Sequence, residues 1–277
     1  MTQSDTPPTL LVGNRTGGQG KTLVAQLLHY GYGLAGTEMR VVAADTSDVE
    51  GGRSKLGQIL KTVDELGIGA RMDQIKADPR KAINYWDKIG THLKEGSTVI
   101  DLGANVLPMV FDWAQQRQAA RVLKNSPISL VVPVTAQRQS IIDAVKMIEE
   151  SQADTAQIPF QHTYVIFNAY HGSFDDLKTT REMRMLQNME QKKSIIRVNM
   201  ARCTTEVWER IEANFTRLSE VAQLEHDDFI ERFELDPFAA SGAHSDFMTW
   251  LRDTLAAFRS AKLIPAGLDA QSLQPAA

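Results

Sequence analysis

The sequence of 277 residues has little of several features, and each shortage excludes a class of protein. It has one cysteine, Cys203, so no disulfide can form within the chain, which suits a reducing compartment. No apolar run approaches the roughly 20 residues that a membrane-spanning helix needs. The N-terminus lacks the basic and apolar pattern of a secretory signal. These absences together predict a cytoplasmic protein.

The chain also lacks an excess of positive charge. Its net charge is −4, which excludes a protein that binds nucleic acid through its overall field. Residues 178–202 are the exception, because seven lysines and arginines stand there against two glutamates. A solvated helix face explains such a segment, and so does a surface that contacts DNA without sequence preference. Both interpretations stay open at this point.

Apolar runs without polar alternation, separated by helical patterns, make up most of the sequence. Such runs suit strands of a parallel sheet that is covered on both faces. The first expected strand spans residues 10–12. The later ones span residues 39–45, 97–101, 127–132, 163–168 and 194–198. The spacing also predicts helices over 54–66 and 244–261. The pattern predicts an α/β fold with a doubly wound, mostly parallel sheet flanked by helices.

We expect one domain over residues 9–263, because no change of composition divides the chain into two cores. Residues 1–8 are polar and contain two prolines, and they are expected to form a flexible tail. Residues 264–277 are small and polar and are expected to form a second tail. In such a fold the ligand binds at the carboxyl ends of the strands. Polar residues that end a strand are therefore the first candidates for a site.

A glycine-rich stretch, residues 13–22, connects the first strand to the first helix. Glycines let backbone N–H groups surround an anion, and the helix N-terminus adds further donors and partial positive charge. Lys21 is placed to contact the terminal phosphates of a nucleotide, and the Thr22 hydroxyl is placed to ligate Mg2+. The stretch departs from the strict phosphate-loop pattern, because Arg15 stands where that pattern has a glycine.

The run from Gly17 to Thr22 resembles the deviant Walker A loop of the ParA/MinD family of ATPases. That family has a lysine at the position of Thr16, which reaches the phosphates of a partner chain in a nucleotide-bound dimer. The resemblance implies slow hydrolysis here, and it leaves open whether Arg15 replaces the lysine. The residues that it implies for nucleotide binding are Arg15, Thr16, Gly17, Gly18, Gln19, Gly20, Lys21, Thr22 and Asn168.

Acidic residues also stand at the ends of two expected strands. Asp101 ends the strand at 97–101, where a phosphate-loop fold places a carboxylate that holds magnesium, so Thr22 and Asp101 are the expected metal site. Where family members usually have a proline two places on, this chain has Gly103. Asp45 and Asp48 follow the second strand, and with Lys21 they form the expected catalytic set. The resemblance implies that one of the two aspartates orients the attacking water.

Asn168 ends the strand at 163–168. The family has an asparagine there that contacts adenine, and an amide offers the donor and acceptor that the adenine edge requires. A capping role in a turn is the alternative for the same residue. The first interpretation predicts ATP or ADP as the bound nucleotide.

The resemblance implies a ParA/MinD-like ATPase that binds ATP and Mg2+ and acts in plasmid or DNA partition, positioning or mobilisation. It implies a homodimer on ATP binding, a partner protein, and non-specific DNA contact through residues 178–202. No membrane contact is expected, because the sequence shows no recognisable amphipathic, basic membrane helix near the C-terminus. One alternative is a small-molecule enzyme of the dethiobiotin synthetase or cobyrinate amidase type, which shares the phosphate loop. The other is a nucleotide-bound scaffold that barely hydrolyses. Turnover measured with and without DNA separates the three.

Overall fold

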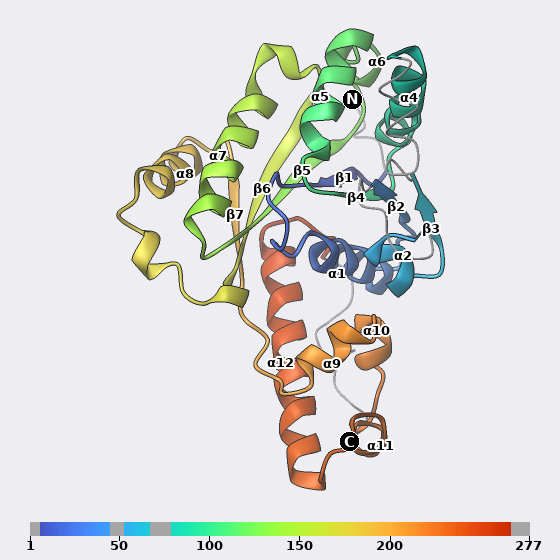
Figure 1. The fold of residues 1–277 in the computed structure, drawn as a ribbon, viewed down its shortest axis with the longest axis vertical. Coiled ribbons are helices and arrows are strands. Elements are labelled where there is room, and N and C mark those ends of the chain that lie inside the picture. The colour runs from blue at the N-terminus through green and yellow to red at the C-terminus, as the bar shows by residue number, and fades with distance from the viewer. Residues whose placement is uncertain (1–5, 45–52, 67–78, 267–277) are drawn as a thin grey trace.

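The computed structural model describes residues 6–44, 53–66 and 79–266. Seven strands in this part of the chain form one sheet, drawn in Figure 1. The strands are β1 (Thr9–Val12), β2 (Arg40–Ala44), β3 (Val63–Glu65), β4 (Thr98–Leu102), β5 (Ile128–Thr135), β6 (Phe160–Asn168) and β7 (Ile196–Met200). Their order is β3-β2-β4-β1-β5-β6-β7, and every neighbouring pair is parallel. The predicted α/β fold with a parallel sheet is confirmed.

Helices connect these strands. The α-helices are α1 (Lys21–Leu34), α2 (Lys55–Ile59), α4 (Pro79–Glu95), α5 (Val106–Arg117), α6 (Ala120–Leu123), α7 (Arg138–Gln152), α8 (Arg181–Gln191), α9 (Trp208–Ala213), α10 (Leu218–Val221), α11 (His226–Phe233) and α12 (Pro237–Ser260). Short 3-10 turns occur at Asp154–Ala156, Ala169–His171 and Asp175–Leu177. No helix within the described ranges is long and apolar enough to cross a bilayer.

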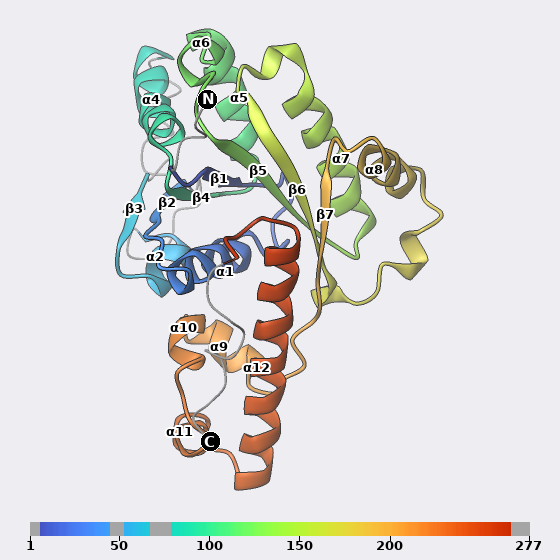
Figure 2. The same cartoon turned by 180° about the vertical axis from the view of Figure 1, so that it is seen from behind.

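The sheet separates two hydrophobic clusters, because alternate residues of a strand point to opposite faces. In β1, Leu10 and Val12 pack with α1 and α12, whereas Leu11 packs with α4, α5 and α7. Figures 1 and 2 show the same arrangement, with α4 to α8 on one side of the sheet and α1, α2 and α12 on the other. Both faces are therefore covered, which is why the strand sequences are apolar without alternation.

The C-terminal helices extend the layer that contains α1, α2 and α12 beyond the sheet. Helix α12 runs away from the sheet edge, and α9, α10 and α11 lie beside it (Figures 1 and 2). It begins at Pro237, seven residues before the predicted start at 244, because Asp236 accepts hydrogen bonds from the N–H groups of Phe238 and Ala239. Aspartate at the N-cap followed by proline is a helix start that the apolar spacing alone does not show.

The prediction of one helix over 54–66 is wrong. Helix α2 ends at Ile59, Leu60 takes an extended backbone, and Val63 pairs with Val41 as part of β3. The apolar spacing is helical, but Val63 is β-branched and gains pairing with the edge of the sheet. The strand predicted at 194–198 occurs two residues later, as Ile196–Met200. The residues beyond 66 up to 78 lie outside the described part.

The inner ends of the two segments predicted as tails contact the rest of the protein. The Pro7 carbonyl accepts a hydrogen bond from the N–H of Ser97, at 2.8 Å. Ile264 is buried against α1, and a Cβ added to Gly31 would lie 2.7 Å from its side chain. The ordered packing therefore includes Pro7 and Ile264, which correspond to the ends of the segments predicted as tails.

Candidate functional site

The glycine-rich stretch forms a loop between β1 and α1, at the carboxyl edge of the sheet. Helix α1 begins at Lys21, and Gly20 is its N-cap residue with φ of 84°. Gly18 also has a positive φ, 74°. A Cβ on Gly20 would lie 2.6 Å from the Asn168 amide nitrogen, which is closer than a side chain allows. Gly20 is thus required both by its backbone angle and by the close approach of β6.

Gln19 braces this loop from inside. Its side chain is 1% exposed, and its Nε2 donates to the Gly17 carbonyl at 2.8 Å. Its Oε1 accepts hydrogen bonds from the hydroxyls of Thr135 and Ser140, at the end of β5 and the start of α7. The Thr135 distance is 2.7 Å. Gln19, predicted as part of the nucleotide loop, therefore holds the loop shape by its side chain.

The side chains of Arg15 and Thr16 turn to helix α7. Arg15 forms an ion pair with Glu150, and the Thr16 hydroxyl donates to Asp143. Asn14 fixes the preceding backbone, because its buried amide donates to the Pro133 carbonyl at 2.7 Å. The cavity beside the loop is lined from Gly17 onward and includes neither Arg15 nor Thr16. The side chains of these two residues, which the sequence predicted to contact the nucleotide, therefore bind α7 of the same chain and do not line the cavity.

Thr22 and Asp101 lie together at the start of α1. The Thr22 hydroxyl donates to Asp101 Oδ2 at 2.8 Å, and Asp101 is 8% exposed. The contact follows from strand order, because β4 lies beside β1 and Asp101 pairs with Val12, the last residue before the loop. Lys21 lies at the same place, and its Nζ donates to the Thr16 carbonyl at 3.0 Å. The sheet therefore brings together the two residues of the predicted metal site and the lysine predicted to contact the phosphates.

Asn168, at the end of β6, contacts the loop from the other side. Its Nδ2 donates to the Gln19 carbonyl at 3.3 Å, and its Oδ1 accepts from the N–H of Tyr170 at 3.1 Å. It is 3% exposed. The turn-capping role that the sequence allowed is present, and it is combined with support of the loop. An amide nitrogen carries two hydrogens, so Nδ2 can donate both to the loop and to a base. Contact with adenine stays a prediction.

The other two predicted catalytic residues, Asp45 and Asp48, lie outside the described residues. The described chain resumes at Arg53.

A cavity of about 890 Å3 adjoins the loop. Asp101, Ser54 and Lys55 line its side near β4 and β2, and Asn168 and Tyr170 line its side near β6. Its remaining wall comes from α9 and α10 and is mostly apolar. That wall consists of Trp208, Ile211, Glu212, Ala213, Phe215, Thr216 and Leu218. The size and the mixture of an apolar wall with a few polar groups are typical of a small-molecule site.

Sequence reasoning missed most of this wall. Trp208, Ile211 and Leu218 stand at helical spacing and pack in the core, and nothing in that spacing shows that the same face also borders a cavity. Tyr170 lies in the turn after β6, and its hydroxyl donates to Glu212 at 3.5 Å. The negative charge of Glu212 raises the pKa of Tyr170. Two segments that lie 42 residues apart thus meet at the mouth of the cavity.

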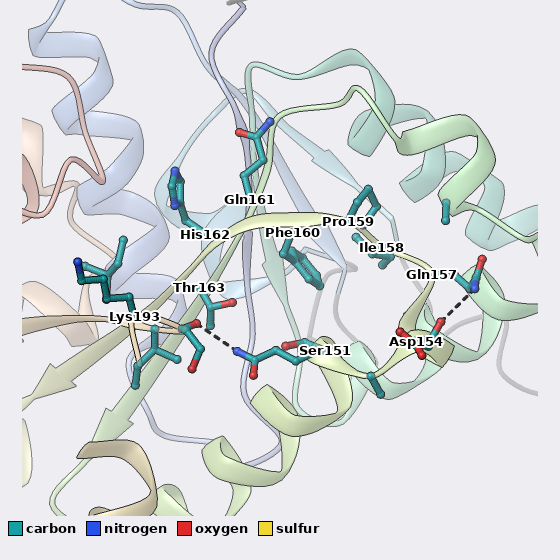
Figure 3. Close-up of a pocket in the computed structure, with 16 residues that line it drawn as sticks. Ser151, Asp154, Gln157, Ile158, Pro159, Phe160, Gln161, His162, Thr163 and Lys193 are labelled. Atoms are coloured by element: carbon teal, nitrogen blue, oxygen red, sulfur yellow. Dashed lines mark hydrogen bonds between the residues drawn. The ribbon is translucent and has the colours of Figure 1, made fainter. Parts of the chain in front are cut away.

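A second hollow of about 540 Å3 lies at the opposite, amino-terminal edge of the sheet. Figure 3 shows its polar side chains, among them Gln161, His162 and Lys193, around the start of β6. Gln152 donates to the Ser194 carbonyl at 3.1 Å across its floor. It has no glycine-rich loop and no paired hydroxyl and carboxylate among its described lining residues. The chemistry expected from the sequence therefore belongs to the cavity at the carboxyl edge.

Comparison with known proteins gives likeness in structure but not in sequence. No protein-family profile matches the chain, and no curated protein matches it. A ParA family ATPase from Chlorobium tepidum TLS has a TM-score of 0.50 and 14% identity, over 87% of this chain and 98% of that chain. An ATP complex of a Cyanothece McdA variant has a TM-score of 0.48 and 12% identity, over 96% of this chain and 100% of that chain.

The MinC:MinD cell division protein complex of Aquifex aeolicus has a TM-score of 0.43 and 14% identity, over 95% of this chain and 98% of that chain. Identities this low bear on the fold alone. Together with the parallel seven-stranded sheet, the likeness to the Chlorobium ATPase shows that this chain shares the α/β fold of that protein.

Proposed function

We propose that this protein binds Mg-ATP at the loop of residues 17–22 and acts as a ParA/MinD-like nucleotide switch. The observation that carries the proposal is the contact between Thr22 and Asp101 at the start of α1, 2.8 Å long, in a cavity that also contains Lys21. A helix N-terminus preceded by glycines with positive φ supplies the backbone donors for phosphate. No other described place in the chain combines these groups.

The donor set fits magnesium. A hydroxyl and a carboxylate oxygen are hard ligands, which Mg2+ prefers, and it usually completes its shell with water and phosphate oxygens. Thr22 and Asp101 would hold the ion, and Lys21 would contact the phosphates. Mg2+ bound there would neutralise part of the phosphate charge. In this proposal Gln19 and Asn168 hold the loop in the shape that receives the phosphates, through their hydrogen bonds to Thr135 and to the loop backbone.

The finer parts of the proposal rest on the resemblance given above. They are hydrolysis, a homodimer formed on ATP binding, a partner protein, and a role in partition or positioning of DNA or another cargo. In that scheme Asp45 or Asp48 orients the attacking water, and Asn168 contacts adenine. A turnover assay with and without DNA tests the switch: nucleotide binding without hydrolysis under either condition would favour a scaffold instead.

Basal hydrolysis is expected to be slow, because the position of the family lysine holds Thr16, whose hydroxyl is bound to Asp143. Thr16→Lys is expected to raise turnover or ATP-dependent dimerisation several-fold, since it restores a cation to the loop. Thr16→Val is the matched control, because it removes the hydroxyl without adding charge. Single-turnover hydrolysis and light scattering measure the two quantities.

Arg15→Ala tests whether the neighbouring arginine already replaces that lysine. Its side chain pairs with Glu150 of α7 and does not line the cavity, so we expect the variant to change turnover less than about twofold. A large loss of turnover would assign Arg15 the role of the missing lysine. If neither Thr16→Lys nor Arg15→Ala changes turnover or dimerisation, the dimer mechanism is wrong for this protein.

DNA contact is proposed for residues 178–202, which form α8 and the segments around it at the edge of the sheet. Three of its cations already have partners: Lys178 pairs with Asp175, Arg184 donates to the Thr179 carbonyl, and Arg197 lies 4.0 Å from the centre of the Phe167 ring. Arg181, Lys192 and Lys193 are exposed and form no ion pair with any described residue. Replacing these three by glutamate is expected to abolish duplex binding with ATP present.

The measurement is fluorescence anisotropy with labelled duplex in a salt series. Native binding should weaken steeply as salt rises, because contacts to phosphates release counterions, and it should show little base preference. The control replaces Lys61, Lys88 and Lys94 by glutamate, which makes the same change of net charge at other exposed positions. Equal loss in both triple variants would mean that overall charge, not this surface, governs binding.

A further inference from the structure

The two ends of the cavity differ in chemistry. Asp101 and Thr22 lie on the side of β4 and β2, whereas Asn168 and Tyr170 lie on the side of β6. Because a metal-bound phosphate chain must lie near the carboxylate, a nucleotide in this cavity points its terminal phosphate toward β4 and β2. The residues that line that end besides Asp101 include Ala43, Ser54 and Lys55.

Positive charge is scarce around this cavity. The lysines and arginines that line it among the described residues are Lys21 and Lys55. Arg15 is held by Glu150, and Thr16 carries no charge. Lys55 is exposed and forms no ion pair with a described residue. A nucleoside triphosphate brings several negative charges to this place, so a second cation there is favourable.

The backbone that carries Lys55 is fixed in place. The preceding residue, Ser54, donates from its N–H and its hydroxyl to Glu65 Oε1 at 3.1 and 2.9 Å. The Ser54 hydroxyl also accepts from the N–H of Gly57 at 2.9 Å, which caps α2. A Cβ on Gly57 would lie 1.8 Å from Glu65 Oε1, so a larger residue there would displace the Glu65 carboxylate that binds Ser54. Lys55 is therefore presented from a rigid corner between α2 and the end of β3.

We propose that Lys55 binds the terminal phosphate of the nucleotide and supplies, within one chain, a charge that the glycine-rich loop lacks. The proposal rests on the function proposed above and names one further residue of that site. Lys55 lies at the phosphate end of the cavity and carries a charge that no described side chain neutralises. The hydrogen bonds of Ser54 hold the backbone beside it in place. Neither the glycine-rich motif nor the resemblance assigns it a role.

The experiment is isothermal titration of the purified full chain with ATP and with ADP, both with Mg2+. Lys55→Ala is expected to weaken ATP binding at least about tenfold, as for loss of one charged hydrogen bond, and to weaken ADP binding less than about twofold. Lys55→Arg keeps the charge and is expected to retain most of the ATP affinity. Lys61→Ala, just beyond α2, is the matched control and should leave both affinities unchanged.

The outcomes distinguish failure of the proposed function from failure of the proposal for Lys55. If the native chain binds neither nucleotide, the proposed function fails and the proposal for Lys55 fails with it. If the native chain binds ATP and Lys55→Ala binds it equally well, only the proposal for Lys55 is overturned. Equal weakening of ATP and ADP would also overturn it, since a contact to the terminal phosphate cannot act on ADP. Circular dichroism of each variant establishes that α2 and the sheet are intact.

Discussion

Replacing Lys21 by alanine is expected to weaken binding of Mg-ATP at least about tenfold, equivalent to about 1.4 kcal/mol. Lys21 is the first residue of α1, 9% exposed, and it lines the cavity beside the Thr22 and Asp101 pair. Its ammonium would exchange the Thr16 carbonyl for phosphate oxygens, and charged hydrogen bonds of that kind are among the stronger ones. Isothermal titration of native and variant chains measures the ratio.

Two results would speak against this role of Lys21. One is unchanged ATP affinity in the variant, which would remove the phosphate-loop assignment. The other is a loss equal to that of Lys88→Ala, a control that removes an exposed lysine far from the cavity. Thermal unfolding of both variants provides the check that the lysine, rather than folding, accounts for the difference.

Replacing Phe247 by alanine is expected to lower the free energy of unfolding by about 3–5 kcal/mol, the range for a fully buried aromatic side chain. Phe247 lies in the middle of α12, is 0% exposed, and packs in the cluster that joins α12 to α1 and the sheet. Its ring centre lies 6.0 Å from that of Trp250. The loss includes both the transfer of the ring to water and the cavity left behind.

The same helix offers the control. Phe238, in the first turn of α12, is 90% exposed, so Phe238→Ala is expected to change stability by less than about 0.5 kcal/mol. Urea unfolding followed by tryptophan fluorescence measures both variants. A loss below about 1 kcal/mol for Phe247→Ala would mean that α12 contributes little to the core and unfolds apart from the sheet.

Local patterns were sufficient to predict most strands of the sheet and the glycine-rich loop before α1. The run Leu10–Val12, the glycines after it and the helical spacing from Leu23 are all short-range signals, and each corresponds to an element of the structure. Asp101 was placed correctly because a strand that ends in an acid needs only strand order to bring it beside the loop. The signal in these cases lies within a few residues of the site.

Contacts between distant segments were not predictable in this way. The ion pair of Arg15 with Glu150 joins residues 135 positions apart, and no local pattern shows that the arginine turns to α7. The edge strand at Val63 was read as helix, because its apolar spacing is helical and its partner Val41 is 22 residues away. The apolar wall of the cavity was likewise missed. Apolar side chains that face the core and apolar side chains that face a ligand cavity give the same spacing in the sequence.

The most direct test of the central claim is isothermal titration of the native chain with ATP, in buffer with Mg2+ and in buffer with EDTA. We expect saturable binding of one ATP per chain that weakens at least about tenfold without Mg2+, and a smaller dependence on Mg2+ in Asp101→Asn. Absence of ATP binding at millimolar nucleotide with Mg2+, or equal affinity with and without the ion in the native chain, would contradict the proposed site.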